Sequence, residues 1–179
     1  MDFLELSKKR FSVLEYTDRP VDQNKIDRIL EAGLSAPTAC NNQPQRILTV
    51  NDDEGRRRLK KAVPSRYAVP AAFLVCYDQR ACWVRPFDGK MSGEIDASIV
   101  CTHMMLEATA LGLGSIWVMY WDPEKIKKEF RLDDGIEPVA LLVVGYKSEN
   151  AKPRPGHTAS KRKEDILLHL PAQDRKDET

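Results

Sequence analysis

Several widespread functional signatures are absent from this 179-residue chain. Its four cysteines form no CxxC pair, so neither a zinc knuckle nor a dithiol redox motif is indicated. The two common phosphate-binding patterns, GxGxxG after a strand and GxxxxGK[ST], do not occur. The three histidines have no HxH or HExxH spacing, and there is no GxSxG. We therefore predict no metal site and no protein nucleophile.

The chain also lacks long apolar runs and an excess of charge of one sign. Stretches such as Val139–Val144 are too short to cross a bilayer, and Met1–Arg10 has the pattern of a short amphipathic helix rather than a signal peptide. The net charge is +1, so no global field attracts nucleic acid or an acidic membrane. We expect a cytoplasmic protein that binds neither, with reduced and mostly buried thiols.

Apolar periodicity and turn residues predict one α+β domain over residues 1–179, with one sheet and helices packed on it. Helices are expected at Met1–Arg10, Asp22–Leu34 with Asp22 as N-cap, Glu54–Ala62, Glu94–Leu113 and from Asp122-Pro123 onward. Strands are expected at Arg46–Asn51, Ala71–Tyr77, Ser115–Trp121 and Val139–Tyr146.

Two features predict a homodimer. The helix Glu94–Leu113 is apolar on nearly every side, which is typical of a helix enclosed by the fold or by a partner. After the last strand, Ser148–Ser160 is polar and rich in proline, and Ile166–Leu170 is apolar again. A short arm of this kind buries its apolar end only against another surface. We therefore expect residues 148–179 to pack on a partner subunit.

Four separate polar clusters are candidates for chemistry. Arg10-Phe11-Ser12 places a guanidinium beside a hydroxyl, a pair that suits a phosphate monoester. The amides of Pro37–Pro44 present donors and acceptors together, which suits the edge of a heterocycle. The others are Gly112–Pro123 and the basic run Ser160–Lys163. Taken singly, each also fits a plain turn or a solvated charged end.

Taken in order, these clusters resemble the nitroreductase family of FMN-dependent enzymes. The resemblance covers Phe3–Leu170 and rests on RFSVLEYTDRPV, SAPTACNNQPQR, DASIVCTHMMLEATALGLGSIWVMYWDPEKIKKEF, EPVALLVVGY and KRKEDIL. It implies a single mixed, mainly antiparallel sheet flanked by helices, with the C-terminal arm exchanged in a homodimer. It also implies an FMN cofactor held in a cleft that two copies complete.

The resemblance assigns the FMN phosphate to both ends of the chain. Arg10 and Ser12 match the family's N-terminal phosphate grip, with Phe11 between them. Leu14 stands where the family commonly has a third basic residue. A basic residue among Lys161, Arg162 and Lys163 matches the C-terminal grip.

It assigns the flavin ring to three other segments. The turn that lines the flavin from the partner subunit matches Pro37, Thr38, Ala39 and Asn41, with Gln43 in support. Arg66 matches a basic group near the pyrimidine, where a cation would stabilise the reduced ring. Met119 and Tyr120 match the segment whose backbone N–H groups approach flavin N5. Tyr120 stands where a small residue is common, which narrows access to the flavin face.

The implied activity is a ping-pong reaction. NADH or NADPH gives hydride to flavin N5 and leaves, and an electron-poor small molecule, such as a nitro compound or quinone, is then reduced in the same place. One alternative is an FMN carrier or sensor that does not react with NAD(P)H. Another is a nucleic-acid module using Arg56–Arg58, Lys60–Lys61 and Lys161–Lys163, which the near-neutral charge and the lack of interleaved aromatics disfavour.

Overall fold

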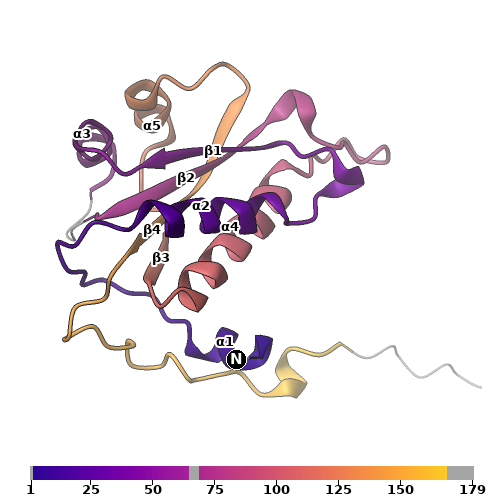
Figure 1. The fold of residues 1–179 in the computed structure, drawn as a ribbon. Helices are drawn as coiled ribbons and strands as arrows, with labels where there is room; N and C mark the ends of the chain where they lie inside the picture. Colours follow the sequence, from indigo (N-terminus) through magenta and orange to yellow (C-terminus); the bar gives the residue numbers. More distant parts are fainter. Residues whose placement is uncertain (1, 65–68, 169–179) are drawn as a thin grey trace, which may run out of the picture.

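The computed structural model describes residues 2–64 and 69–168 (Figure 1). The helices are α1 (Phe3–Lys9), α2 (Gln23–Leu34), α3 (Asp53–Ala62), α4 (Gly93–Ala110) and α5 (Pro123–Phe130). The strands are β1 (Gln45–Val50), β2 (Ala71–Asp78), β3 (Gly114–Val118) and β4 (Ile136–Gly145). Short 3₁₀ turns cover Ala39–Asn41, Gln79–Ala81 and Lys163–Asp165.

The four strands form one sheet in the order β1-β2-β4-β3, and each neighbouring pair is antiparallel. A parallel contact in the described part of the chain is the isolated bridge between Ser12 and Ser115, which places the N-terminal segment beside β3. The predicted α+β fold with a single, mainly antiparallel sheet is confirmed.

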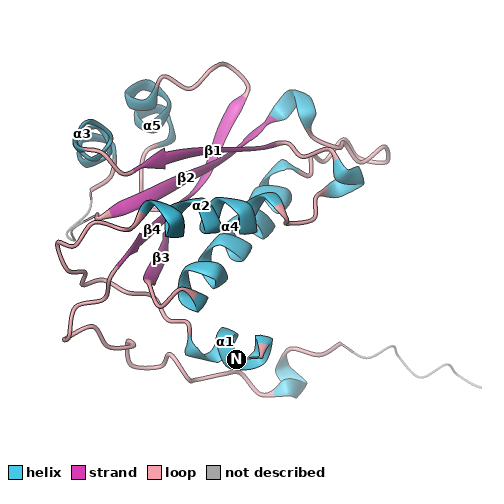
Figure 2. Cartoon of the chain, viewed as in Figure 1, coloured by secondary structure: helices cyan, strands magenta, loops and turns pink. Residues whose placement is uncertain are grey.

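Both faces of the sheet are covered, as Figure 2 shows. Along β2, Phe73 and Val75 pack in the core beneath α2 and α4, whereas Leu74 and Cys76 belong to the core beneath α3 and α5. Side chains alternate between faces along a strand, so a strand covered on both faces needs apolar residues throughout. Every residue of β2 is buried, which explains its continuous apolar sequence.

Two elements end earlier than the sequence pattern predicts. α4 stops at Ala110 rather than Leu113 because the chain turns at Gly112, whose φ is +79°. β3 stops at Val118 rather than Trp121. The Trp121 indole donates to the Val118 carbonyl at 3.1 Å, and the Trp121 amide donates to the Met119 carbonyl at 3.0 Å. Met119 and Tyr120 therefore belong to a turn and not to a strand.

Asp22 does stand at the start of α2, but its side chain does not cap the helix as predicted. Its carboxylate instead accepts a hydrogen bond of 2.6 Å from the hydroxyl of Tyr146, just beyond β4. This hydrogen bond lowers the pKa of Asp22 below its ordinary value of 3.8, and the charges of Arg19 and Lys25 act in the same direction. A hydrogen bond between residues 124 positions apart thus takes the place of the predicted hydrogen bond to the start of α2.

We expect Tyr146→Phe to lower the free energy of unfolding in a pH-dependent way. Because the folded-state pKa of Asp22 is depressed, its contribution is fully present above the unfolded value near 3.8 and is lost as pH falls through the folded value. Urea unfolding at pH 7, 5, 4 and 3 should show a difference in the free energy of unfolding between wild type and variant, and this difference should disappear below pH 4. Phenylalanine keeps the ring over which Arg19 stacks. A difference of constant size at all pH values would contradict the assignment.

One side of α4 is left uncovered in the single chain. Ala97, Val100 and Met104 are buried in the core, but Ile95 is 54% exposed. An open cavity of about 500 Å³ lies along this side and is lined by Glu94, Ile95, Ser98, Ile99, Thr102 and His103. The apolar character of α4 is thus only partly explained by the fold of one chain.

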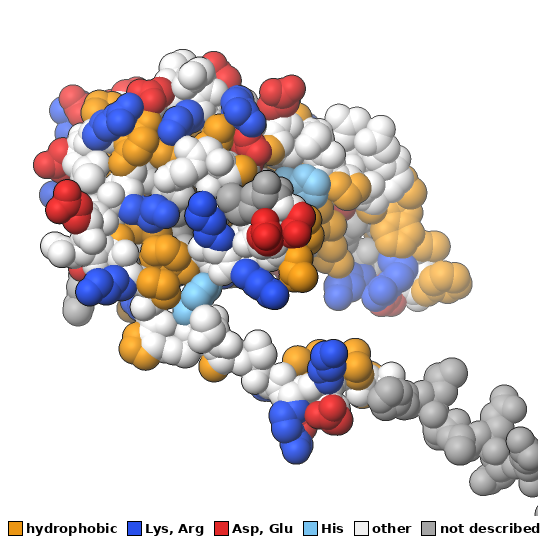
Figure 3. All heavy atoms as spheres, turned by 60° about the horizontal axis from the view of Figure 1, so that its bottom comes forward, with side chains coloured by type: hydrophobic (Ala, Val, Ile, Leu, Met, Phe, Trp, Pro, Cys, Tyr) orange, Lys and Arg blue, Asp and Glu red, His pale blue; other side chains and the backbone are white. Residues whose placement is uncertain are grey.

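The C-terminal arm leaves the body of the molecule after β4 and runs past α1 (Figure 1), and Figure 3 shows part of the chain projecting from the body. Its apolar end is solvent-exposed, and Leu168 is 99% exposed. Residues 169–179 lie outside the described part of the chain. Among the described residues, no helix combines the length and apolarity needed to cross a membrane.

Candidate functional site

The predicted phosphate grip lies where α1 meets the edge of the sheet. Arg10 ends α1, and Ser12 is held opposite Ser115 because the Val13 amide donates to the Ser115 carbonyl at 2.9 Å. The Ser12 side chain is exposed and Arg10 is half-buried. Within the described residues the Arg10 guanidinium has no hydrogen bond or ion pair. An unpaired guanidinium beside a hydroxyl fits a phosphate monoester.

Phe11 and Leu14 belong to the same segment as Arg10 and Ser12 and carry no charge. The Phe11 ring meets the His157 ring edge-on at a centroid distance of 6.1 Å, and the Lys147 ammonium lies 5.6 Å from the Phe11 ring centre. The first part of the arm therefore packs on its own subunit. Leu14 is half-buried. Nearby, the buried Ser115 hydroxyl has no hydrogen-bond partner among the described residues.

The turn Pro37–Pro44 has a strained backbone. Cys40, Asn41 and Gln43 have φ values of +51°, +54° and +50°, a region that residues with a Cβ seldom adopt. All three are exposed. Within the turn, the backbone N–H of Gln43 donates to the Thr38 hydroxyl at 3.0 Å. Strain of this kind persists only where the surroundings impose it, and it is enriched at ligand-binding sites.

A residue that the sequence interpretation did not single out, Asp96, holds this turn in place. Its carboxylate accepts one hydrogen bond from the Ala39 amide at 2.9 Å and another from the Ser92 hydroxyl at 2.7 Å. Asp96 lies in the first turn of α4 and is 1% exposed. A buried carboxylate requires such partners. The signal available in the sequence was an aspartate at the same helical spacing as the apolar residues Val100 and Met104.

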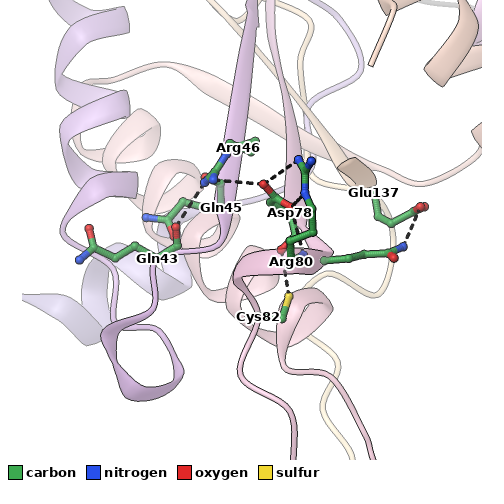
Figure 4. A network of polar contacts seen from close by, with 8 residues as sticks. Gln43, Gln45, Arg46, Asp78, Arg80, Cys82 and Glu137 are labelled. Atoms are coloured by element: carbon green, nitrogen blue, oxygen red, sulfur yellow. Dashed lines mark hydrogen bonds and ion pairs between the residues drawn. The ribbon is translucent and has the colours of Figure 1, made fainter. Parts of the chain in front are cut away.

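The other end of the turn is held by an arginine–aspartate network (Figure 4). Arg46 donates to the carbonyls of Gln43 at 3.3 Å and Gln45 at 2.9 Å, and it lies 3.4 Å from the Asp78 carboxylate. Arg80 binds the same carboxylate through two nitrogens at 2.8 and 3.0 Å. The hydrogen bonds from Arg80 lower the pKa of Asp78, so the carboxylate stays ionised.

Met119 and Tyr120 lie directly after β3, next to the end of α3. Their side chains are 65% and 79% exposed in the single chain. Arg66, the predicted cation near the pyrimidine, lies outside the described residues. Of the basic run Lys161–Lys163, Arg162 forms an ion pair with Asp165 at 2.9 Å.

Within the described residues, the predicted phosphate grip and the strained turn lie far apart in a single chain. The turn is fixed to the start of α4 through Asp96, whereas Ser12 pairs with Ser115, shortly after α4 has ended (Figure 1). From Asp96 to Ala110 the helix advances by about 21 Å at 1.5 Å per residue. The predicted phosphate grip and the strained turn are therefore two candidate half-sites at opposite ends of one helix.

The fold and these half-sites define a class: an α+β protein with one antiparallel sheet whose candidate ligand site is split between the two ends of its central helix. Comparison with known proteins identifies the family. The chain belongs to the nitroreductase family, whose model matches residues 7–75 and 70–146. It is accordingly an enzyme of the oxidoreductase class.

Known proteins similar to the chain support this assignment. A nitroreductase family protein from Clostridium difficile 630 has 42% identity and a TM-score of 0.89, covering 96% of this chain and 99% of its own. A Methanothermobacter thermautotrophicus protein whose name pairs NADH dehydrogenase with NAD(P)H nitroreductase is 30% identical over 162 residues, or 84% of this chain and 80% of its own. A Bacillus subtilis protein named FMN reductase [NAD(P)H] is 25% identical over 80% of this chain and 65% of its own.

Proposed function

We propose that two copies of the chain bind FMN between them and that the enzyme transfers hydride from NAD(P)H to an electron-poor acceptor in a ping-pong reaction. The observation that carries the proposal is the separation of the two half-sites along α4. Because each subunit presents both parts, a two-fold axis would allow the turn of one subunit to meet the phosphate grip of the other.

Two surfaces of the single chain support the dimer. The uncovered side of α4 is apolar at Ile95 and Ile99, and the arm carries exposed Ile166, Leu167 and Leu168. Apolar side chains exposed in a group indicate an interaction surface. A partner that covers α4 and receives the arm would bury both.

The residues fit FMN in their chemistry. When bound, FMN supplies the hydride transfer between NAD(P)H and the acceptor. Arg10 and Ser12 would hold the phosphate, together with a basic residue from the run Lys161–Lys163. The strained turn offers the exposed amides of Asn41 and Gln43 to the ring edge. Asp96 and Arg46 orient the turn before the ligand arrives.

The direct test is a visible spectrum of the purified protein, followed by anaerobic mixing with NADH and with NADPH. We expect a yellow dimer whose flavin is released as FMN on denaturation and is bleached by at least one of the two nucleotides. A colourless protein that takes up no FMN on reconstitution would refute the proposal. Bound flavin that neither nucleotide bleaches would favour the carrier or sensor instead.

Cysteine reactivity gives a second test that does not depend on turnover. Cys40 is exposed on the strained turn, whereas Cys76 and Cys101 are buried, and burial raises the pKa of both thiols to about 12. Because the thiolate is the reactive form, we expect Cys40 to react fast with a thiol reagent and the buried pair to react only on unfolding.

Binding of FMN should slow the Cys40 reaction at least about tenfold if the turn lines the flavin in the dimer. The rate is measured with a chromogenic disulfide reagent, with and without FMN, and Cys40→Ser identifies the fast phase. An unchanged Cys40 rate in fully flavin-loaded protein would place the turn away from the flavin.

A further inference from the structure

A second cavity, here called the lysine pocket, lies on the side of the sheet covered by α3 and α5. It occupies about 500 Å³ between the C-terminal end of α3 and the segment that joins β3 to α5. The side chains that matter for its chemistry are Lys60 and Lys61 from α3, Met119, Tyr120 and Asp122 from the joining segment, and Lys125 from α5. This cavity is separate from the one along α4.

The charge of the lysine pocket favours an anion. Three lysines face one acidic residue, Asp122, in a protein whose net charge is only +1. The Asp122 carboxylate is already engaged as the cap of α5, because it accepts from the Glu124 amide at 3.1 Å. It also forms an ion pair with the Lys125 ammonium at 4.0 Å, and Lys61 pairs with Glu129 at 3.8 Å, whereas Lys60 has no ion pair within the described residues. Lys60 is therefore the pocket cation that no carboxylate pairs with among the described residues, and the ion pairs of Lys61 and Lys125 are long.

The same pocket offers an aromatic surface. Tyr120 is 79% exposed, and the neighbouring Trp121 indole is fixed by its hydrogen bond to the Val118 carbonyl. Exposed aromatic rings stack with planar bases, and lysines bind phosphates as point charges. An aromatic side chain next to several ammonium groups suits a nucleotide better than a simple inorganic anion.

The position of the pocket connects it with the reaction proposed above, on which the next step rests. Met119 and Tyr120 line the pocket and also form the segment assigned to flavin N5. A hydride donor whose reactive ring reaches this segment extends its remaining part over the adjoining surface. We propose that the lysine pocket binds the phosphate-bearing adenosine part of the nicotinamide dinucleotide, with Lys60 and Lys125 contacting phosphate. The pocket thereby favours NADPH, whose 2′-phosphate adds roughly −1.5 to −2 charges at pH 7.

The proposal is tested by a double variant and a control of equal charge. Lys60→Ala/Lys125→Ala removes two cations from the pocket, and Lys90→Ala/Lys128→Ala removes two exposed cations that do not line it. Calorimetric titration of the flavin-loaded protein with adenosine 2′,5′-bisphosphate and with 5′-AMP measures binding without turnover. We expect the pocket variant to lose roughly tenfold or more in bisphosphate affinity, and the control to change less than about twofold.

Steady-state kinetics should show the same pattern. In the pocket variant kcat/KM for NADPH should fall by at least about tenfold and that for NADH by less, with the FMN content unchanged. Equal losses in the control variant, failure of wild type to bind the bisphosphate, or loss of FMN from the pocket variant would each overturn the proposal. Failure of the proposed function is distinguishable, because it appears in wild type as missing flavin or unbleached flavin.

Discussion

Asp96→Ala is expected to destabilise the protein by about 3 kcal/mol, because the Ala39 amide and the Ser92 hydroxyl lose a shared charged acceptor. Without these hydrogen bonds the turn loses its attachment to α4, and its three strained residues should relax toward ordinary backbone angles. If the turn lines the flavin, only a small fraction of molecules stays competent to bind it. An anchoring loss of about 3 kcal/mol corresponds to FMN affinity roughly a hundredfold lower.

Two further variants separate this role of Asp96 from general damage. Asp96→Asn keeps an acceptor for the Ala39 amide and a donor for the Ser92 oxygen, so FMN affinity should stay within a few-fold of wild type. Glu31→Ala removes an exposed carboxylate of α2 that does not line the cavity along α4, and it should have little effect. Urea unfolding and FMN titration provide the two measurements. Equal FMN affinities in wild type and Asp96→Ala would show that the turn is not held for flavin.

Gly93→Ala is expected to destabilise the protein by about 3 kcal/mol, although alanine favours helices over glycine. A Cβ at Gly93 would lie 2.6 Å from the Cys82 sulfur and would overlap the ring of Tyr77. Tyr77 is buried at the end of β2, so its ring has little room to move. Overpacking therefore makes the substitution destabilising, although helix propensity alone predicts that it stabilises the protein. Urea unfolding measures the loss.

A comparison of two glycines isolates the cause. Gly89 has a φ of +73° and open space around its Cα, so Gly89→Ala should cost only about 1–2 kcal/mol from backbone strain. Adding Cys82→Ala should recover part of the Gly93→Ala loss and none of the Gly89→Ala loss. If Gly93→Ala were neutral or stabilising, the close packing between α4, Tyr77 and Cys82 would be wrong.

Much of the architecture could be predicted because it depends on local patterns. The apolar run Ala71–Tyr77 predicted strand β2, and Asp122-Pro123 predicted the start of α5. The prolines and amides of Pro37–Pro44 predicted an irregular segment with binding groups, and the structure adds the strained backbone. Arg10 and Ser12 could be proposed together because they are neighbours in the chain.

The contacts that complete the site were not predictable in this way, because their partners are far apart in sequence. Asp96 meets Ala39 across 57 residues, and Arg46 meets Asp78 across 32. The expected cap at Asp22 failed because a tyrosine 124 residues away is positioned to donate to the same carboxylate. Sequence periodicity describes one element at a time and contains no information on which elements meet.

The sequence by itself determined the elements and the family, since both depend on residue types at fixed spacing along the chain. The tertiary structure alone decided that the phosphate grip and the strained turn lie at opposite ends of α4, and that three lysines from two helices share one pocket with Tyr120. The physical reason is that the packing of α4 against the sheet sets the distance between the half-sites, whereas the local sequence pattern sets only which residue types each half-site contains.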